Sequence, residues 1–290
     1  MNEINKILIE KPNLSALTRN YTAVDLHFHS KHSDGNSTVA EIAERAEKLN
    51  IGIAITDHNE IRGSIEISRY SDVLSIPGIE ITSKEGAHIL VYFHSIESLK
   101  TFFENDIKPY LGNDKMSSIS LTLSEIIERA NSFDSLTVFP HPFGSAYAGV
   151  CNSSIPKKQQ AGHLKKIDGI EVLNASNLKR SNLRSAMLGF NLNKIVTGGS
   201  DGHSLSHMGK VVCYAKCEKN RKAFFDALKN RESRVIGKEI NMLRKLTSHG
   251  MKLKTNFRNY QNIIEKNVRY GYVLINVKSK TMRENFSLKS

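Results

Sequence analysis

The stretch Asp25-Leu-His-Phe-His-Ser-Lys-His-Ser-Asp-Gly35 combines the pattern of a strand end with several potential metal ligands. Side chains alternate along a β-strand, so His27 and His29 point to the same side and can bind one ion. Asp34 lies beside Gly35 in an expected turn and can supply an oxygen ligand. A mixed set of imidazoles and carboxylates suits Zn²⁺, Mn²⁺ or Fe²⁺ better than Ca²⁺ or Mg²⁺. This segment therefore predicts a transition-metal site at the end of a strand.

Strand and helix patterns alternate along most of the remaining chain. The expected strands are 23–29, 51–56, 73–82, 88–93, 136–141, 167–174, 194–200 and 210–215. The expected helices are 38–50, 95–104, 122–133, 178–190 and 221–230, and the first and third begin with the capping boxes Thr38 with Glu41 and Thr122 with Glu125. This alternation predicts an α/β fold with a parallel sheet, and about seven units favour a closed or nearly closed barrel.

Potential ligands recur where the expected strands end. In barrels of this kind the active site lies at the carboxyl ends of the strands. The further side chains at this level are His58, Glu80, His141, Asp201 and His203, with His88 expected in a loop on the same rim. A single histidine after a strand is most often an ordinary core or surface residue, but six histidines at one level indicate a shared metal site.

In chain order the motifs are His-x-His, Asp-Gly, Thr-Asp-His, Gly-Ile-Glu, a later His, Pro-His-Pro and Ser-Asp-x-His. This order resembles the PHP superfamily, named for polymerase and histidinol phosphatase, over about Thr22 to Lys238. The resemblance implies a distorted (β/α)7 barrel at 22–238. The other two parts would be an N-terminal extension at 1–21 and a small, basic, helical C-terminal appendage at 239–290. The resemblance also implies two or three divalent transition-metal ions (Mn, Fe or Zn) as cofactors.

Carried over position by position, the resemblance implies three sets of metal ligands. One ion would be held by His27, His29, Glu80 and Asp201, a second by Glu80, His88 and His141, and a third by Asp34, His58 and His203. The first of these sets would also be the catalytic set. The chemistry expected of such a centre is hydrolysis of a phosphate ester by metal-activated water. The chain has neither a Gly-x-Ser-x-Gly elbow nor a Gly-x-x-x-x-Gly-Lys-Ser/Thr loop, which argues against a serine hydrolase and a P-loop enzyme.

Substrate-binding candidates follow from the same resemblance. Asn174 and Arg180 lie in and after the strand that places an Asn and an Arg over the metals in the family, and a guanidinium matches two phosphate oxygens. Ser33 and Lys31, in the first ligand loop, could also reach a phosphoryl oxygen. Arg180 could equally be a solvated helix residue. Asp57, beside His58, is expected to orient a ligand histidine rather than to bind metal.

Three functions remain open at this point. The first, which we favour, is a phosphatase or phosphoesterase acting on nucleotides or short oligonucleotides. The second is a histidinol-phosphate phosphatase, because the ligand motifs alone do not separate the two branches. The third is a non-catalytic, metal-stabilised module that binds nucleic acid. The spacing from Glu80 to His88 and a basic C-terminal segment favour a nucleotide substrate.

Charge and composition set the remaining limits. The net charge is +12, and residues 241–290 carry eleven Lys and Arg against two Glu, which is +9 of that total. Such a segment can bind nucleic acid or another polyanion, although a solvated surface is the simpler interpretation. The three cysteines form no Cys-x-x-Cys pair, and no stretch is apolar enough for a signal peptide or a membrane span. A cytoplasmic protein is therefore expected.

Overall fold

A computed structural model describes residues 6–240 of the chain except 115, 145–147 and 154. The chain divides into two units, Met1–Ile240 and Asn241–Ser290. The predicted basic appendage therefore lies, except for Glu239 and Ile240, outside the described residues. Within the described part no helix is both long and apolar enough to cross a membrane.

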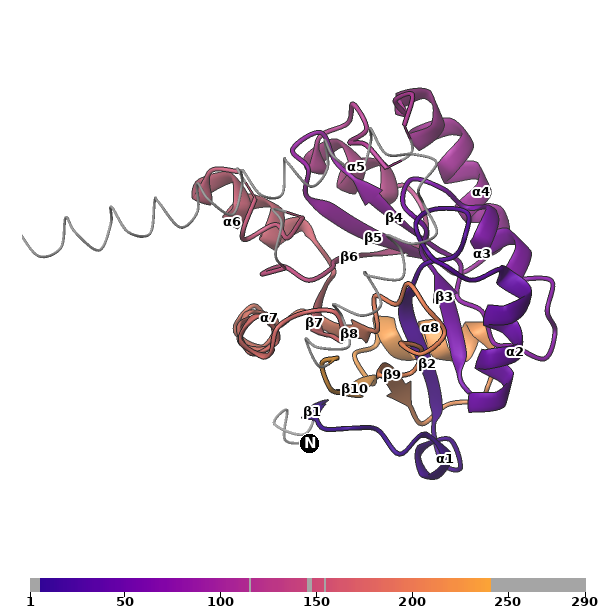
Figure 1. The fold of residues 1–290 in the computed structure, drawn as a ribbon. Coiled ribbons are helices and arrows are strands. Elements are labelled where there is room, and N and C mark those ends of the chain that lie inside the picture. Colours follow the sequence, from indigo (N-terminus) through magenta and orange to yellow (C-terminus); the bar gives the residue numbers. More distant parts are fainter. Residues whose placement is uncertain (1–5, 115, 145–147, 154, 241–290) are drawn as a thin grey trace, which may run out of the picture. The chain divides into compact units, whose positions relative to one another are not determined.

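Ten strands form two sheets of five in the described part of the chain (Figure 1). The first sheet has the order β1 (Ile7–Ile9), β10 (Arg234–Gly237), β9 (Val211–Ala215), β2 (Thr22–Phe28) and β3 (Gly52–Ile55). The second has the order β4 (Gly78–Thr82), β5 (His88–Phe93), β6 (Ser135–Phe139), β7 (Gly169–Asn174) and β8 (Ile195–Gly199).

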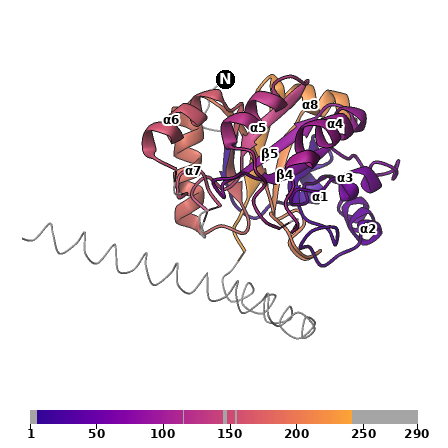
Figure 2. The ribbon, with the colours of Figure 1, turned by 90° about the horizontal axis from the view of Figure 1, so that it is seen from above.

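Helices surround these strands when the molecule is seen from above (Figure 2). They are α1 (Leu14–Leu17), α2 (Val39–Leu49), α3 (Arg62–Ile67), α4 (Ile96–Phe102), α5 (Leu123–Ala130), α6 (Lys157–Lys166), α7 (Lys179–Asn191) and α8 (Arg221–Lys229). A π-helical turn, η2 (Phe103–Ile107), and a 3₁₀ turn, η3 (Lys108–Tyr110), continue α4. The sequence did not predict α1, α3, α6, β1 or β10.

The mixed α/β class is confirmed, but a continuous parallel barrel is not what the described strands form. Four of the eight strand pairs are antiparallel: β10 with β9, β9 with β2, β4 with β5, and β5 with β6. The segment between β4 and β5 is only 83–87, too short for the crossover that parallel neighbours require. Alternating helix and strand patterns do not reveal such a hairpin, because each strand was assigned without a partner.

The two sheets come together at single bridges rather than along full ladders. His58 bridges to Glu80, and Phe28 bridges to Gly202. Both bridges involve residues next to, or among, the predicted metal ligands. The ends of the two sheets therefore meet at one place, and the candidate ligands are concentrated there.

The local sequence explains where the helices begin. The Thr38 amide donates to Glu41 Oε2 at 2.7 Å and the Glu41 amide donates to Thr38 Oγ1 at 3.3 Å, so the first predicted capping box is confirmed. The second, with Thr122 and Glu125, is confirmed at the start of α5. The apolar face of α2 packs in a core cluster that includes fully buried Phe28, and burying such a side chain contributes about 1.5–3 kcal/mol. The apolar face of α5 packs in the other core cluster.

Candidate metal centre

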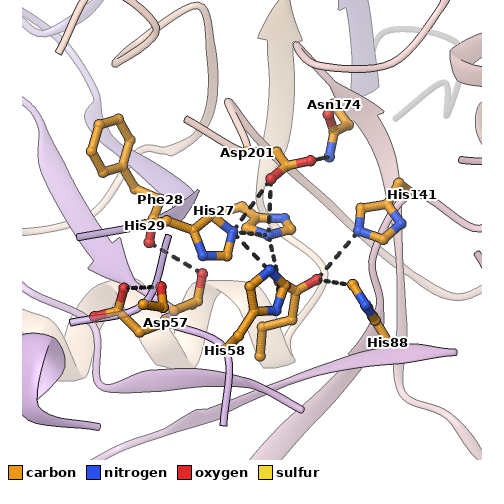
Figure 3. A network of polar contacts seen from close by, with 12 residues as sticks. His27, Phe28, His29, Asp57, His58, His88, His141, Asn174 and Asp201 are labelled. Carbon is orange, nitrogen blue, oxygen red and sulfur yellow. Dashed lines mark hydrogen bonds and ion pairs between the residues drawn. The ribbon is translucent and has the colours of Figure 1, made fainter. Parts of the chain in front are cut away.

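The nine predicted metal-binding side chains lie together near strand ends of both sheets. Figure 3 labels six of them: His27, His29, His58, His88, His141 and Asp201. Those from the first sheet are His27 in β2, His29 directly after it, Asp34 in the following loop, and His58 after β3. Those from the second sheet are Glu80 in β4, His88 at the start of β5, His141 after β6, and Asp201 and His203 after β8. The structure thus brings all nine into one cluster, while their roles as ligands stay predictions.

Four groups of potential ligand atoms can each surround one ion, because within each group the atoms lie no more than 4.8 Å apart. The groups are His29, Asp34, His58 and His203; His27, His29 and Asp201; His27, Glu80 and His141; and His58, Glu80 and His88. The first contains the whole predicted third set and adds His29. The predicted first and second sets are distributed over the other three groups, with Glu80 in two of them.

Glu80 is the central carboxylate of this cluster. Its Oε1 atom lies 2.9 Å from His88 Nδ1 and 3.2 Å from His141 Nε2. Its Oε2 atom lies 3.1 Å from His58 Nδ1 and 3.4 Å from His27 Nε2. Each oxygen therefore faces a different set of imidazoles, which is the arrangement that a carboxylate bridging two cations requires.

The β4–β5 hairpin explains how His88 reaches Glu80. His88 pairs directly with Thr82 in the antiparallel register, and Thr82 lies on the same face of β4 as Glu80 two residues earlier. Diagonal neighbours on one face of a sheet are close enough for long side chains to meet. The hairpin, and not a separate loop, thus places this histidine at the cluster.

Asp201 lies close to His27 in β2 and to His29 directly after it. Its Oδ1 atom lies 3.3 Å from His29 Nε2 and 3.6 Å from His27 Nε2, and these two imidazole nitrogens are 3.2 Å apart. A Cβ atom at Gly199 would lie 2.4 Å from His27 Cβ. Only glycine therefore allows β8 to pass this close to β2 and present Asp201.

Several buried nitrogen and oxygen atoms of the cluster form no hydrogen bond within the described part of the chain. They are His29 Nδ1 and His141 Nδ1, together with His58 Nδ1 and Glu80 Oε2, which face each other at 3.1 Å. Buried polar atoms normally have partners, and leaving one without costs about 1–3 kcal/mol. Imidazole and carboxylate atoms that converge in this way fit a divalent transition metal, which would satisfy them.

Electrostatics support the same interpretation. Burial lowers the pKa of the His58 imidazole to about 3, so the ring is neutral near pH 7 and can offer a lone pair. Burial disfavours the charged form of His27 as well, but Glu171, Glu80 and Asp201 raise the pKa of His27 well above its usual value. The cluster thus concentrates negative charge around His27, and a metal ion can compensate this charge as a proton does.

Backbone conformation marks two of the nine positions. His141 has φ +29° and Asp201 has φ +48°, in the left-handed region that residues other than glycine rarely adopt. Strain of this kind is concentrated at functional sites, where the surrounding structure compensates its cost of about 1–3 kcal/mol. Each residue lies two positions after the end of a strand, where the chain turns and brings the side chain to the cluster.

Glu171, in the middle of β7, is a site residue that sequence reasoning missed. Its Oε1 atom lies 2.9 Å from His27 Nδ1, and its Oε2 atom accepts hydrogen bonds from the His141 amide and the Asn174 side chain, both at 2.8 Å. When His27 Nδ1 donates to this carboxylate, His27 Nε2 presents its lone pair to the cluster. The sequence signal that could have identified Glu171 is an acidic residue within the otherwise apolar strand β7 (Gly169–Asn174).

Replacing Glu171 by Gln is expected to lower metal affinity and turnover by roughly 10- to 100-fold, because His27 loses the partner that fixes its orientation. Metal content and steady-state kinetics measure the effect. Glu128→Gln, on the exposed face of α5, is the matched control and should behave as wild type. Wild-type metal affinity and turnover in Glu171→Gln would show that Glu171 is not a positioning residue.

Asp57 organises the loop that carries the ligands, and it contacts no ligand side chain through the hydrogen bonds observed. Its carboxylate accepts from the Ser30 amide at 2.7 Å, from Ser30 Oγ at 2.6 Å and from Ser33 Oγ at 2.6 Å. A Cβ atom at Gly63 would lie 2.2 Å from Asp57 Oδ2, so glycine leaves room for the carboxylate beside α3. Asp57 thus holds the segment between His29 and Asp34 in place, a role different from the predicted orientation of a histidine.

Substituting Asp57 by Asn is expected to destabilise the protein by about 1.5–3 kcal/mol, since hydrogen bonds to a buried charged acceptor are weakened. Urea unfolding monitored by circular dichroism measures the change. Asp72→Asn, at an exposed turn residue, serves as the control. A stability change below about 0.5 kcal/mol in Asp57→Asn would contradict the role assigned to this loop anchor.

The four predicted substrate-binding residues lie in different environments. Asn174 is fully buried, and its amide nitrogen lies 2.8 Å from Glu171 Oε2 and 3.3 Å from Asp201 Oδ2. Ser33 Oγ donates to Asp57. Lys31 and Arg180 are exposed, the second of them in the first turn of α7. Exposure leaves Lys31 and Arg180 accessible to a ligand, whereas Asn174 acts on the acidic side chains around it.

Comparisons with known proteins agree with this geometry. The sequence model of the PHP domain family matches residues 25–139. An uncharacterized protein of Methanocaldococcus jannaschii is 28% identical over 166 residues, which cover 52% of this chain and 81% of that protein. The matched family segment contains Asp34, His58, Glu80 and His88, in addition to the opening His-x-His pair.

Two solved structures share the fold. One is a lesion-specific endonuclease from Pyrococcus furiosus, with 20% identity, a TM-score of 0.60, and coverage of 74% of this chain and 57% of that chain. The other is a two-domain protein from Bacteroides vulgatus that contains a predicted PHP-like metal-dependent phosphoesterase, with 18% identity, a TM-score of 0.55, and coverage of 80% and 68%. Residues 25–139 thus match the PHP domain family, and the described part of the chain shares its fold with both solved structures.

Proposed function

We propose that this protein is a phosphoesterase that hydrolyses phosphate esters of nucleotides or short oligonucleotides by metal-activated water. The observation that carries the proposal is the nine-residue cluster, in which Glu80 offers one oxygen to each of two sets of imidazoles. The two proteins of similar fold, a lesion-specific endonuclease and a protein that contains a predicted PHP-like metal-dependent phosphoesterase, support a phosphate ester as substrate.

Two or three divalent ions, Mn²⁺, Fe²⁺ or Zn²⁺, would be held by the nine side chains. When bound, such ions lower the pKa of water toward neutrality and offset the negative charge of a phosphate. The protein positions the ligands for this role. Glu171 contacts His27, and Asn174 donates to Oδ2 of Asp201 while Oδ1 faces His27 and His29. His27, His29, Glu80 and Asp201 form the proposed catalytic set.

The substrate side of the proposal rests on two exposed cations that follow residues of the site in the chain. Lys31 follows the first ligand histidines and Arg180 lies in the first turn of α7, and both side chains are exposed. Arginine can bind two oxygens of a phosphate at once, and lysine binds as a point charge. We propose that these two residues contact phosphate oxygens, while Ser33 and Asn174 act mainly through Asp57 and Asp201.

A substrate panel tests the proposed function. The protein is supplied with Mn²⁺, Fe²⁺ or Zn²⁺ and incubated with a nucleoside 3′,5′-bisphosphate, 5′-phosphorylated short RNA and DNA, and histidinol phosphate. Phosphate or nucleotide release from the first three substrates is the expected result. Release from histidinol phosphate alone would favour the second branch, and no release from any substrate would favour the non-catalytic module.

The basic segment 241–290 is the proposed site for longer polyanions, because it carries a net charge of +9. Trimming the chain after Lys238 is expected to weaken binding to long single-stranded nucleic acid more than turnover of a mononucleotide. Salt-dependent binding and steady-state kinetics measure the two effects. If binding to nucleic acid and turnover of the mononucleotide fell by the same factor, the segment would contribute to the stability of the whole protein rather than to polyanion binding.

A further inference from the structure

A surface hollow lies outside the nine-residue cluster, between the loop after β2 and helix α3. Its volume is about 450 Å³, and its lining residues are His32, Arg62, Ile65, Glu66, Arg69 and Tyr70. Small-molecule sites in proteins usually measure roughly 300–1,000 Å³. The hollow is therefore large enough for a ligand, and the proposed reaction uses none of its side chains.

The lining combines apolar and aromatic surface with flat cations. Ile65 and Tyr70 are partly buried and pack against the hydrophobic cores, so they form a fixed wall. Arg62 and Arg69 are exposed at the rim. Tyrosine rings and guanidinium planes both stack on flat heteroaromatic groups, and this stacking does not require a particular base.

Charge in the hollow is largely compensated. Arg62 Nε donates to Glu60 Oε2 at 2.9 Å, and a terminal nitrogen of Arg62 lies 2.8 Å from the same oxygen. His32 Nε2 lies 3.0 Å from Glu66 Oε2. Two carboxylates beside two cations and a histidine make a poor site for a bare phosphate. The same groups supply the donors and acceptors that a neutral, planar, polar group needs.

The hollow shares a loop with the candidate metal centre. His32 lies three residues after His29, and three residues span at most roughly 11 Å. The His32 amide donates to Ser30 Oγ, which donates to Asp57. The wall formed by His32 is therefore anchored to the same carboxylate as the ligand loop, and it lies within reach of a nucleotide whose phosphate is at the cluster.

We propose that this hollow binds a nucleobase of the substrate. The inference rests on the proposed function, because it names the part of a nucleotide substrate that is recognised away from the metal centre. A base would stack on Tyr70 and a guanidinium, with its polar edge facing the His32 and Glu66 pair. The enzyme would then prefer nucleotides to phosphate esters that lack a base.

A binding experiment tests the hollow without any turnover. The chain contains no tryptophan, so Tyr70→Trp creates a single fluorescent reporter in the hollow. Titration with adenosine, in the absence of added metal, is expected to quench this reporter in a saturable way. Phe190→Trp, at a position 57% exposed on α7, is the matched control and should show no saturable quenching. No quenching of Tyr70→Trp, equal quenching of both variants, or a response to inorganic phosphate alone would overturn the proposal.

A kinetic experiment with the natural Tyr70 provides the second measurement. The ratio of kcat/KM for adenosine 3′,5′-bisphosphate to kcat/KM for p-nitrophenyl phosphate is expected to fall about tenfold in Arg69→Ala, as for the loss of one stacking partner. Arg19→Ala, an exposed arginine on the segment before β2, should keep the wild-type ratio. An unchanged ratio in Arg69→Ala would overturn base recognition. Saturable adenosine binding by a protein that hydrolyses none of the esters would instead overturn the proposed function alone.

Discussion

Glu80→Gln is expected to lower the rate of phosphate ester hydrolysis by roughly a thousandfold. The amide keeps the size of the side chain but removes the charge that both sets of imidazoles face. Metal ions stabilise such transition states by several kcal/mol, and each 1.4 kcal/mol corresponds to a factor of ten. The loss is expected in kcat, and metal analysis of the purified variant should show fewer bound ions per chain.

The matched control for this substitution is Glu47→Gln, the same chemical change on the exposed face of α2. It should leave the rate and the metal content at wild-type values. A Glu80→Gln variant that keeps its metal and stays within tenfold of the wild-type rate would refute the bridging role of this carboxylate. Circular dichroism of the variant separates loss of the site from loss of the fold.

Removal of divalent metal by a chelator is expected to abolish turnover and to lower the melting temperature. An ion present at a hundred times its dissociation constant stabilises the folded protein by about 2.7 kcal/mol. For a folded unit of this length, 1 kcal/mol shifts the melting temperature by about 2–4 °C, so each lost ion should cost about 5–10 °C. The buried carboxylates and imidazoles of the cluster lose their common partner at the same time.

Differential scanning fluorimetry before chelation, after chelation and after readdition of Mn²⁺, Fe²⁺ or Zn²⁺ measures this shift. Readdition should restore both the melting temperature and the turnover. The Glu80→Gln variant, treated in parallel, should respond less than wild type. A chelated protein that melts at the original temperature and still turns over substrate would contradict a metal centre at this site.

Residue spacing alone predicted most of the elements that carry the cluster. The apolar runs before His29, His58 and His141 end within a few residues of where β2, β3 and β6 end. The Thr38 and Thr122 capping boxes predicted the starts of α2 and α5, because both signals are local. Placing the nine side chains at one level followed from the same logic, since strand ends converge in space.

Long-range pairing could not be predicted in this way. Nothing in the run His88–Phe93 states that it pairs antiparallel with β4, and nothing in Ile7–Ile9 states that it pairs with β10. Glu171 was missed for a related reason: its importance comes from partners 144 and 30 residues earlier in the chain. The hollow beside α3 depends on a helix that the sequence patterns did not reveal.

The meeting of two sheets at the candidate ligands has a consequence for how a newly made molecule matures. The candidate ligands between residues 27 and 58 belong to the first sheet, and those from residue 80 to 203 belong to the second. A partial chain that ends before Asp201 therefore lacks the two ligand groups that contain Asp201 or His203. Unfolded chains rarely preform such sites. We therefore expect complete metal loading to follow docking of both halves.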